Sequence, residues 1–294
     1  MRLGSGLHRA RLRPQQVAIA PAFVFTSDWS NSTGNNTTAC RDGTRWDAAN
    51  NIATPSAGRV EVLALSGLGL DFPATMANCL AIRYERTPGN IAFCGVEIQD
   101  GWTLPSVGGV LCKRMYFRMA VARTVTDTHH PVQTKAGTCA YSTEWVMNQG
   151  STFEFQVATL RDGVSPASEI HRWVVAGGLQ RDVTYRIEER YERLTTTTWR
   201  LHVRIYNSAN TLLYDDADLV CNQSGHSSHT LEDNIDIVTP TPECLENLMI
   251  VNQGQLGDLG DRGADAPDEN RIFYGGCAIS KVDWCGPYIL GESP

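Results

Sequence analysis

The run VTYRIEERYERLTTTTWRLHVRIY, residues 183–206, decides the fold class. Before the four threonines, one set of alternate positions holds Val183, Tyr185, Ile187, Glu189 and Tyr191, and the other holds Thr184, Arg186, Glu188 and Arg190. After them, Trp199, Leu201, Val203 and Ile205 alternate with Arg200, His202, Arg204 and Tyr206. A period of two places each set on one face of an extended strand. We therefore expect two half-buried β-strands that pair as a hairpin.

The same alternation recurs along the chain, and no long stretch shows the 3.6-residue period of an amphipathic helix. Residues 207–210, Asn-Ser-Ala-Asn, predict a turn after the hairpin. Further strands are expected at residues 59–65, 79–84, 91–98, 116–123, 153–157, 171–175 and 271–279, and residues 211–214 begin another. Without a repeat or a low-complexity linker, the pattern favours one all-β sandwich domain over residues 22–294.

Composition limits the classes of partner. Hydrophobic residues make up 42% of the 294 residues, which is enough for a large core and typical of a globular protein rather than a disordered one. The formal net charge of −7 argues against nucleic acid as a partner, because phosphate binding favours a basic surface. No apolar run approaches the roughly 18 residues of a membrane helix, so no membrane partner is predicted.

The N-terminal end is basic: Arg2, Arg9, Arg11 and Arg13 occur before any acidic residue. It lacks the apolar stretch and cleavage site of a secretory signal, so none is predicted. Residues 1–21 are instead interpreted as an arm. Two readings stay open: a floppy terminus, or an assembly arm that lies on a neighbouring subunit.

Nine cysteines occur without a Cys-x-x-Cys pair or an adjacent Cys/His cluster, which argues against structural zinc and thioredoxin chemistry. They are expected either to form disulfides or to serve as small buried apolar residues. Cys277 and Cys285 are close enough in sequence to bridge a terminal loop. The sequence leaves the connectivity open.

Two long segments, residues 27–51 and 254–270, are rich in polar residues and glycine and are predicted to be surface loops. The second contains Asp258, Asp261, Asp265 and Asp268, oxygen ligands of the kind that calcium takes. Their spacing does not match an EF-hand loop, and a solvated acidic loop is the competing interpretation. No cofactor is predicted, and calcium stays open as a bound metal.

Several motifs together resemble one family. They are residues 25–30 (FTSDWS), 42–46 (DGTRW), 116–118 (YFR), 129–133 (HHPVQ), 201–207 (LHVRIYN), 274–278 (YGGCA) and 284–288 (WCGPY). Together they look like the concanavalin A-like lectin and glucanase jelly-roll sandwiches encoded by tailed bacteriophages and their environmental relatives. The resemblance spans residues 25–288. It implies two curved antiparallel sheets with the first and last strands adjacent, a concave face that holds sugar, and a place on a virion surface.

The family also implies two enzyme chemistries to test. Retaining glycosidases need paired carboxylates, but in residues 234–238 only Asp236 matches the glucanase strand, and a strand with one exposed acid is the simpler interpretation.

Polysaccharide lyases need a base and a group that neutralises the uronate carboxylate. His130 and Gln133 are similar to the lyase Gln-x-His pair in reversed order. Residues 83–86 are one residue short of the lyase Arg-x-Glu-x-Arg strand, and cross-strand pairing explains them equally well.

Glycan binding asks for an aromatic platform and planar polar side chains. The predicted glycan-binding residues share the non-core face of the sheet or join it: Tyr116, Arg118, His130, Gln133, Arg204 and Tyr206. The alternatives are a solvated face and a face covered by a loop. The seven tryptophans are mostly expected in the core, and an exposed one beside this surface would favour binding.

The sequence therefore predicts a non-enzymatic virion-associated surface or structural protein with a lectin-like sandwich, and no catalytic residues are assigned. Its expected partners are other virion subunits or further copies of itself, held through the arm, with surface polysaccharide as a potential ligand. Its expected location is the virion surface or the extracellular space. The alternative is a polysaccharide lyase or glycoside hydrolase that acts on surface glycans.

Overall fold

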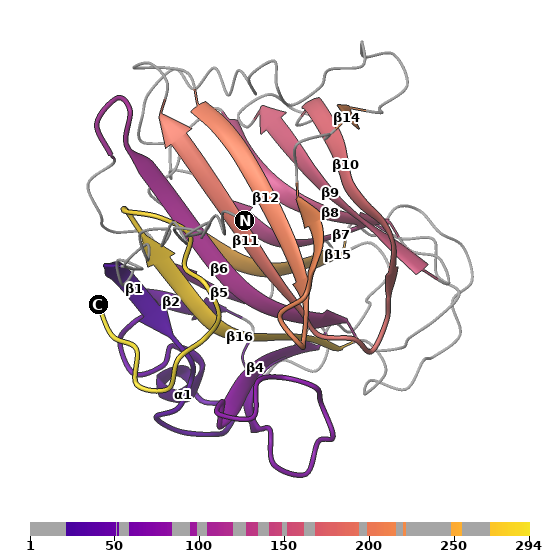
Figure 1. Cartoon of the computed structure of the whole chain (residues 1–294). Helices are drawn as coiled ribbons and strands as arrows, with labels where there is room; N and C mark the ends of the chain where they lie inside the picture. Colours follow the sequence, from indigo (N-terminus) through magenta and orange to yellow (C-terminus); the bar gives the residue numbers. More distant parts are fainter. Residues whose placement is uncertain are drawn as a thin grey trace, which may run out of the picture.

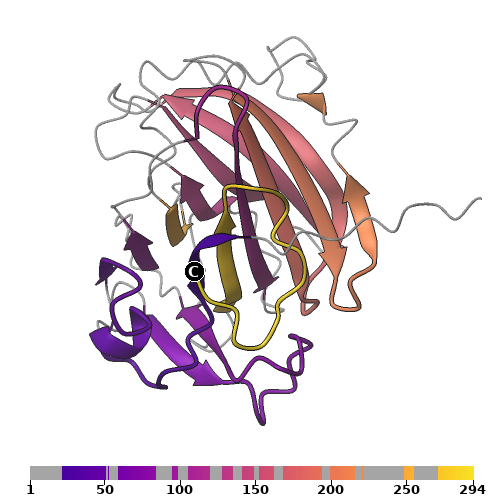
Figure 2. The same cartoon turned by 60° about the vertical axis from the view of Figure 1, so that its left-hand side comes forward.

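The structure is a computed structural model. In it, the chain forms two antiparallel β-sheets that pack face to face (Figures 1 and 2). It describes residues 22–50, 52, 59–83, 95–98, 105–119, 128–134, 141–148, 152–161, 168–193, 199–215, 220–221, 248–254 and 271–294. Sheet A has the order β13-β12-β11-β6-β16-β4-β3, and β1 pairs with β16 beside this path. Sheet B has the order β14-β10-β9-β8-β7-β15-β5-β2.

The strands of sheet A are β1 (Phe23–Ser27), β3 (Arg59–Ala64), β4 (Asn78–Arg83), β6 (Val110–Met119), β11 (Tyr185–Arg193), β12 (Trp199–Asn207), β13 (Leu212–Asp215) and β16 (Arg271–Ser280). Those of sheet B are β2 (Ala48–Asn50), β5 (Gly95–Ile98), β7 (Thr128–Thr134), β8 (Tyr141–Asn148), β9 (Thr152–Arg161), β10 (Ser168–Gln180), β14 (Val220–Cys221) and β15 (Leu248–Gly254). The expectation that the first and last strands lie side by side is confirmed, because β1 pairs with β16.

The quoted hairpin forms as predicted. β11 and β12 pair without interruption from Tyr185 opposite Asn207 to Arg193 opposite Trp199. Val203 and Ile205 are fully buried in the core between the sheets. Glu189, the acidic exception in the apolar set, also faces this core, where its carboxylate lies 2.5 Å from the Lys113 ammonium. The turn at Asn207 is closed by a hydrogen bond from the Asn210 amide to its carbonyl, 3.0 Å long.

All ten residues of β6 are buried, as are residues 272–280 of its neighbour β16. One face packs in the core between the sheets, which joins sheet A residues such as Phe117 to Val96 and Leu179 of sheet B. The other face lies beneath residues that follow β16, as shown by Tyr116 and Tyr288 in one apolar cluster. The strand begins at Val110, before the predicted start at residue 116, because cover on both faces removes the alternation of polar and apolar residues.

The prediction of a surface loop at residues 27–51 is wrong. This segment contains a helical turn, α1 (Thr37–Cys40), and ends in β2. Trp29 and Trp46 are fully buried and stack with ring centroids 5.8 Å apart. The polar residues that suggested a loop make internal hydrogen bonds instead, such as the Asn36 side chain, which accepts from the Ala39 amide at the start of α1.

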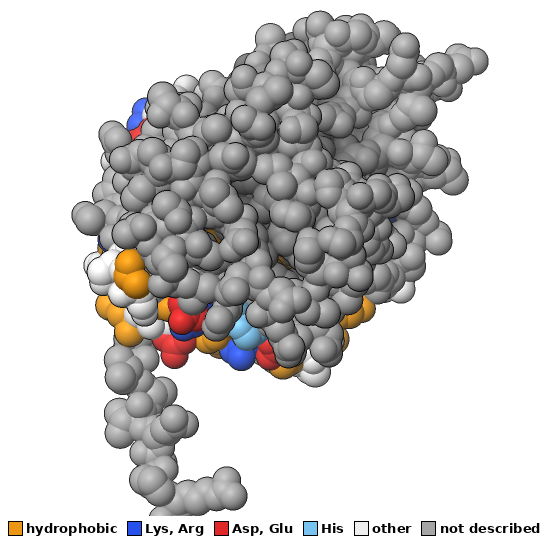
Figure 3. Space-filling model, turned by 90° about the horizontal axis from the view of Figure 1, so that it is seen from above, with side chains coloured by type: hydrophobic (Ala, Val, Ile, Leu, Met, Phe, Trp, Pro, Cys, Tyr) orange, Lys and Arg blue, Asp and Glu red, His pale blue; other side chains and the backbone are white. Residues whose placement is uncertain are grey.

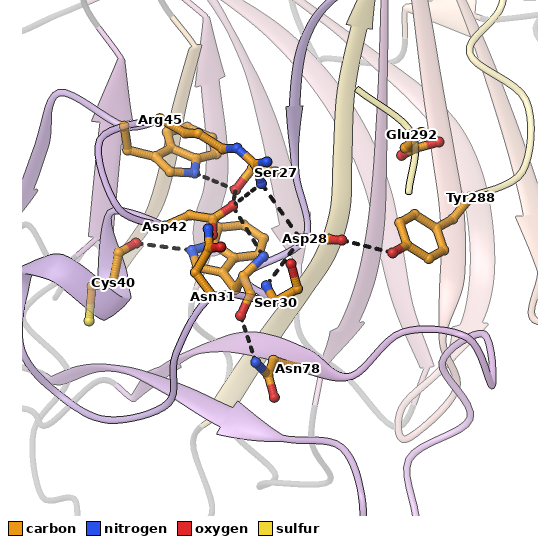
Figure 4. A network of polar contacts seen from close by, with 12 residues as sticks. Ser27, Asp28, Ser30, Asn31, Cys40, Asp42, Arg45, Asn78, Tyr288 and Glu292 are labelled. Carbon is orange, nitrogen blue, oxygen red and sulfur yellow. Dashed lines mark hydrogen bonds and ion pairs between the residues drawn. The ribbon is translucent and has the colours of Figure 1, made fainter. Parts of the chain in front are cut away.

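The Asp42 carboxylate organises this segment (Figure 4). Its side chain is fully buried and accepts hydrogen bonds from the Ser27 hydroxyl at 2.8 Å and from the Asn31 side-chain amide at 2.7 Å. It also accepts from the Trp29 backbone amide at 3.3 Å and from the Arg45 guanidinium at 2.8 Å. A buried charge with this many donors is compensated, so the segment closes around one carboxylate.

Side chains are described for five cysteines, and all five are buried and outside any disulfide: Cys40, Cys79, Cys112, Cys277 and Cys285. For these, the interpretation as small buried apolar residues is confirmed. The suggested bridge between Cys277 and Cys285 does not form. Cys277 faces the core between the sheets, whereas Cys285 packs in a separate cluster with Val110 on the outer face of sheet A.

Other predictions fall outside the described residues: the arm at 1–21, the four aspartates Asp258, Asp261, Asp265 and Asp268, the strand at 234–238, and residues 84–86. Within the part of the chain that the structure describes, no helix has the length and apolar character needed to cross a membrane.

Replacing Asp42 with Asn is expected to lower the free energy of unfolding by about 2–4 kcal/mol. The uncharged amide of Asn would face four hydrogen-bond donors that the Asp42 carboxylate now satisfies. Urea unfolding followed by tryptophan fluorescence measures this, since Trp29 and Trp46 report on the segment. Asp283→Asn is the matched control: Asp283 is exposed and accepts from the adjacent Trp284 amide, so a change within about 0.5 kcal/mol is expected. Equal effects of both substitutions would contradict the role of Asp42.

Candidate glycan-binding surface

Residues 281–294, hereafter the terminal segment, lie across the outer face of sheet A (Figure 2). The Tyr288 amide donates to the Tyr116 hydroxyl at 3.1 Å, and the Gly286 amide lies 3.4 Å from the Glu188 carboxylate. At the far side, the Tyr288 hydroxyl donates to Asp28 at 2.8 Å, which ties the segment to the chain after β1 (Figure 4). The segment therefore covers the part of the outer face that belongs to β6 and β16.

Arg114 on β6 is the anchor beneath the terminal segment. Its guanidinium is fully buried, pairs with the Glu292 carboxylate, and donates to the carbonyls of Gly276 at 2.8 Å and Gly286 at 3.2 Å. Burial alone would lower the pKa of Arg114, but the hydrogen bonds and charge of Glu292 outweigh it and raise the pKa. The guanidinium thus stays charged and requires the segment to remain in place.

Tyr116 and Arg118 lie on the outer face of sheet A, as predicted, but both are buried beneath other parts of the chain. Tyr116 is 1% exposed. Arg118 is 8% exposed and pairs with Asp71, whose carboxylate also accepts from the Thr184 hydroxyl at 2.6 Å. Both residues support packing, which corresponds to the covered face that the sequence left open as an alternative.

His130 and Gln133 lie on β7 in sheet B, so they do not join the other four predicted residues on sheet A. The backbone register places His130 opposite Gln253 of β15 and Gln133 opposite Glu144 of β8. The expectation that all six residues form one surface is therefore wrong. The pairing of strands far apart in sequence, rather than local alternation, decides which sheet a strand joins.

Arg204 and Tyr206 on β12 are half-buried and stay accessible on the outer face. Arg204 belongs to a compact group, hereafter the Trp284 cluster, formed by His202, Arg204, Asp215 and Trp284. The Arg204 guanidinium lies 4.2 Å from the centroid of the Trp284 ring, and its Nε lies 3.2 Å from the Asp215 carboxylate. Figure 3 shows histidine, basic and acidic side chains side by side on the described margin of that view.

His202 completes the cluster. Its Nε2 lies 2.6 Å from Oδ1 of Asp215, and its ring meets the Trp284 ring edge-on with centroids 5.0 Å apart. Burial tends to raise the pKa of Asp215, but the hydrogen bond with His202 and the charge of Arg204 outweigh it, so the pKa is lowered. One carboxylate thus holds a histidine and an arginine that stand two residues apart on the same strand face.

Tyr206 extends this surface along β12. The Arg186 guanidinium covers its ring at 3.8 Å from the centroid and donates to the Asn210 side chain at 3.0 Å. Because alternate residues share a face, His202, Arg204 and Tyr206 present an imidazole, a guanidinium and a phenol in a row along one strand.

The sequence held signals for the residues that were not predicted. His202 belongs to the same alternating set as Arg204 and Tyr206, and Trp284 is the half-exposed tryptophan that was expected to favour binding. Asp215 required the register of β12 against β13, which pairs it with Arg204. The Arg-x-Glu-x-Arg pattern sought at residues 83–86 occurs complete at Arg186, Glu188 and Arg190.

Within that complete pattern, Arg186 and Glu188 are 3% and 1% exposed and pair with each other at 3.0 Å. Because both side chains are buried, they leave little surface for a ligand. Their role is to support the outer face of sheet A. Among the described residues, no group of three or more His, Cys, Asp or Glu side chains is arranged to hold a metal ion.

Comparison with known proteins gives likeness in structure only: no family model and no curated protein matches the chain. A fungal endo-β-1,4-glucuronan lyase from Trichoderma reesei is similar with a TM-score of 0.53 at 10% identity, over 89% of this chain and 96% of that one. A marine alginate lyase from Aplysia kurodai is similar with a TM-score of 0.52 at 9% identity, over 88% and 99%. An endo-1,3-β-glucanase from Streptomyces sioyaensis has a TM-score of 0.48 at 12% identity, over 93% and 99%.

The first two likenesses extend over nearly the full length of each lyase and show the fold. The predicted fold class is confirmed: the chain is an antiparallel jelly-roll β-sandwich, the fold of the two similar polysaccharide lyase structures. The virion setting and the assembly partners stay predictions.

The Asp215 carboxyl is expected to titrate below the ordinary aspartate value of about 3.9, and both His202→Ala and Arg204→Ala should raise its pKa. Because the folded-state pKa is depressed, the stabilisation from Asp215 is present above the unfolded pKa and is lost as the pH falls through the folded pKa. Carbon-detected NMR titration of Asp215 measures the shift. A pKa at or above the ordinary value in the unmodified protein would show that the cluster does not hold this carboxylate.

Proposed function

We propose that the protein is a polysaccharide lyase that acts on a uronate-containing glycan at the outer face of β12. The observation that carries the proposal is the row of His202, Arg204 and Tyr206 on one accessible strand face. These are the three kinds of group that uronate elimination uses, and they occur on a fold of the same type as two known uronate lyases.

Elimination starts with removal of the weakly acidic proton next to the uronate carboxylate, so the carboxylate charge must be neutralised and a base must be near. Arg204 supplies the fixed cation for the carboxylate. His202, held by Asp215, takes the proton, and the Tyr206 hydroxyl returns one to the departing glycosidic oxygen. Successive members of the row are about 7 Å apart along the strand, which suits groups that act on neighbouring parts of a sugar chain.

Trp284 supplies the apolar wall of the site. Sugar rings pack on aromatic side chains, and an indole that is half-exposed beside an arginine offers both an apolar surface and a charge. The contact between the Trp284 ring and the Arg204 guanidinium holds both groups in one orientation before a ligand arrives. Preorganisation of this kind lowers the entropic cost of binding.

The structural neighbours add support of a limited kind. Two similar structures are lyases of glucuronan and alginate, both polymers of uronic acids. Because one fold hosts many functions, this likeness supports a class of substrate, and the activity depends on the side chains of this chain.

The lyase test uses glucuronan, alginate and polygalacturonate as separate substrates, with the ultraviolet absorbance of new unsaturated uronates as the readout. The unmodified protein is expected to release such products from at least one of them. His202→Ala and Arg204→Ala should each lower kcat/KM by about 100-fold or more, the scale of losing a positioned base or a charge-stabilising group. Thermal melting of each variant confirms that it is folded.

The variant His130→Ala locates the chemistry, because His130 is the histidine whose sequence setting is similar to the lyase Gln-x-His pair, and it lies on the other sheet. Retained cleavage with His130→Ala and lost cleavage with His202→Ala places the reaction on β12. The reverse result would move the reaction to β7 and overturn the site proposed here. No unsaturated product from any of the three polymers would overturn the lyase proposal.

A second candidate function, glycan binding without cleavage, is favoured by one observation. His202 and Arg204 are both already engaged by Asp215, an arrangement typical of a rigid binding platform. In that case the protein migrates more slowly through an affinity gel that contains the polysaccharide it binds. Trp284→Ala should weaken binding in these gels by roughly 2- to 10-fold, since aromatic contacts of this kind contribute on the order of 0.5–1.5 kcal/mol. Unchanged retardation of Trp284→Ala would remove the cluster from the binding site.

A further inference from the structure

Two buried cysteines meet beneath the terminal segment. Cys112 lies on β6 and Cys285 on the segment itself, 173 residues apart in sequence. They are 0% and 3% exposed and share a small apolar cluster with Val110 and Ala278. Both are free thiols in this structure.

The contacts around Cys285 show how closely the two residues approach. Its Sγ lies 3.5 Å from the carbonyl oxygen of Cys112 and 3.6 Å from that of Ala278. Cys112 stands opposite Ser280 at the end of β16, so the chain leaves β16 beside Cys112 and returns over it within five residues. This return brings the side chain of Cys285 onto the same outer face as that of Cys112.

We propose that Cys112 and Cys285 form a disulfide in an oxidising environment, and that this bond staples the terminal segment to sheet A. The oxidant is a low-molecular-weight disulfide such as oxidised glutathione. One cysteine thiolate attacks it and releases one glutathione thiol, and the second cysteine then displaces the other. The two protein thiols lose two protons and two electrons, and the small disulfide is reduced to two thiols.

The burial of the two thiols decides at which stage the disulfide can form. Desolvation raises the pKa of Cys112 to about 12 and also raises that of Cys285 well above its ordinary value. The reactive thiolate is therefore scarce while the terminal segment is closed. The bond forms during folding, before the segment covers the pair, and the closed segment then shields it from reductants.

The other cysteines whose side chains are described pack elsewhere, and Cys40 belongs to the core between the sheets. Cys277 faces the core on the opposite side of sheet A, and Cys79 packs in a different cluster with Phe72 and Met76. A bond at Cys285 also fixes the adjacent residue, Trp284, over β12. The staple would thus hold the segment at the point where it meets the Trp284 cluster.

The test refolds the full chain in a buffer of oxidised and reduced glutathione, alkylates the remaining thiols, and maps the peptides without reduction. A peptide pair joined through Cys112 and Cys285 is expected. The oxidised protein should melt roughly 5–10 °C above the reduced protein, because the cross-link closes a long loop of the unfolded chain.

Two variants make the result specific. Cys285→Ser should abolish both the joined peptide and the rise in melting temperature, whereas Cys277→Ala, the control on the opposite face, should keep the joined peptide. The proposal is overturned if mapping of the refolded unmodified protein finds Cys112 and Cys285 alkylated, or finds either one joined to another cysteine. Peptide mapping of the unmodified protein decides the matter even where a variant does not fold.

Discussion

The buried guanidinium of Arg114 is the constraint on which the outer face of sheet A depends. A charge removed from water costs several kcal/mol unless it is paired and hydrogen-bonded. The partners of Arg114 are the Glu292 carboxylate and the carbonyls of Gly276 and Gly286, and two of these three belong to the terminal segment. The segment must therefore lie over β6, and this decides which residues of the sheet stay accessible.

The same constraint explains why only part of the predicted surface is accessible. The alternation at residues 183–206 correctly predicted the hairpin and the face that carries Arg204 and Tyr206, because a period of two is a local property of a strand. The cover over Tyr116 comes from a segment about 170 residues away, and no local pattern contains that information. Membership of His130 and Gln133 in sheet B likewise depends on long-range strand pairing.

Composition misled the interpretation of residues 27–51 for a different physical reason. Polar residues indicate a loop when water is their partner, but here they are partners of one another around Asp42. Trp29 and Trp46 were the counter-signal, since two tryptophans in a short segment are seldom both left exposed. A polar segment that holds large aromatic residues is better interpreted as a folded corner with an internal hydrogen-bond network.

The terminal segment has two opposite effects on the outer face, and they follow from where its charges and rings fall. At Glu292 and Tyr288 it closes the surface over β6, with Arg114 and Asp28 as its partners. At Trp284 it adds an aromatic ring beside Arg204 and His202 on β12, where the surface stays half-open. The chain shares its fold with a structural neighbour at 10% identity, and one fold hosts many functions through differences in its surface residues. The residues that hold the terminal segment down therefore also set the shape of the accessible surface. The stability of this face and the surface that it presents cannot change independently.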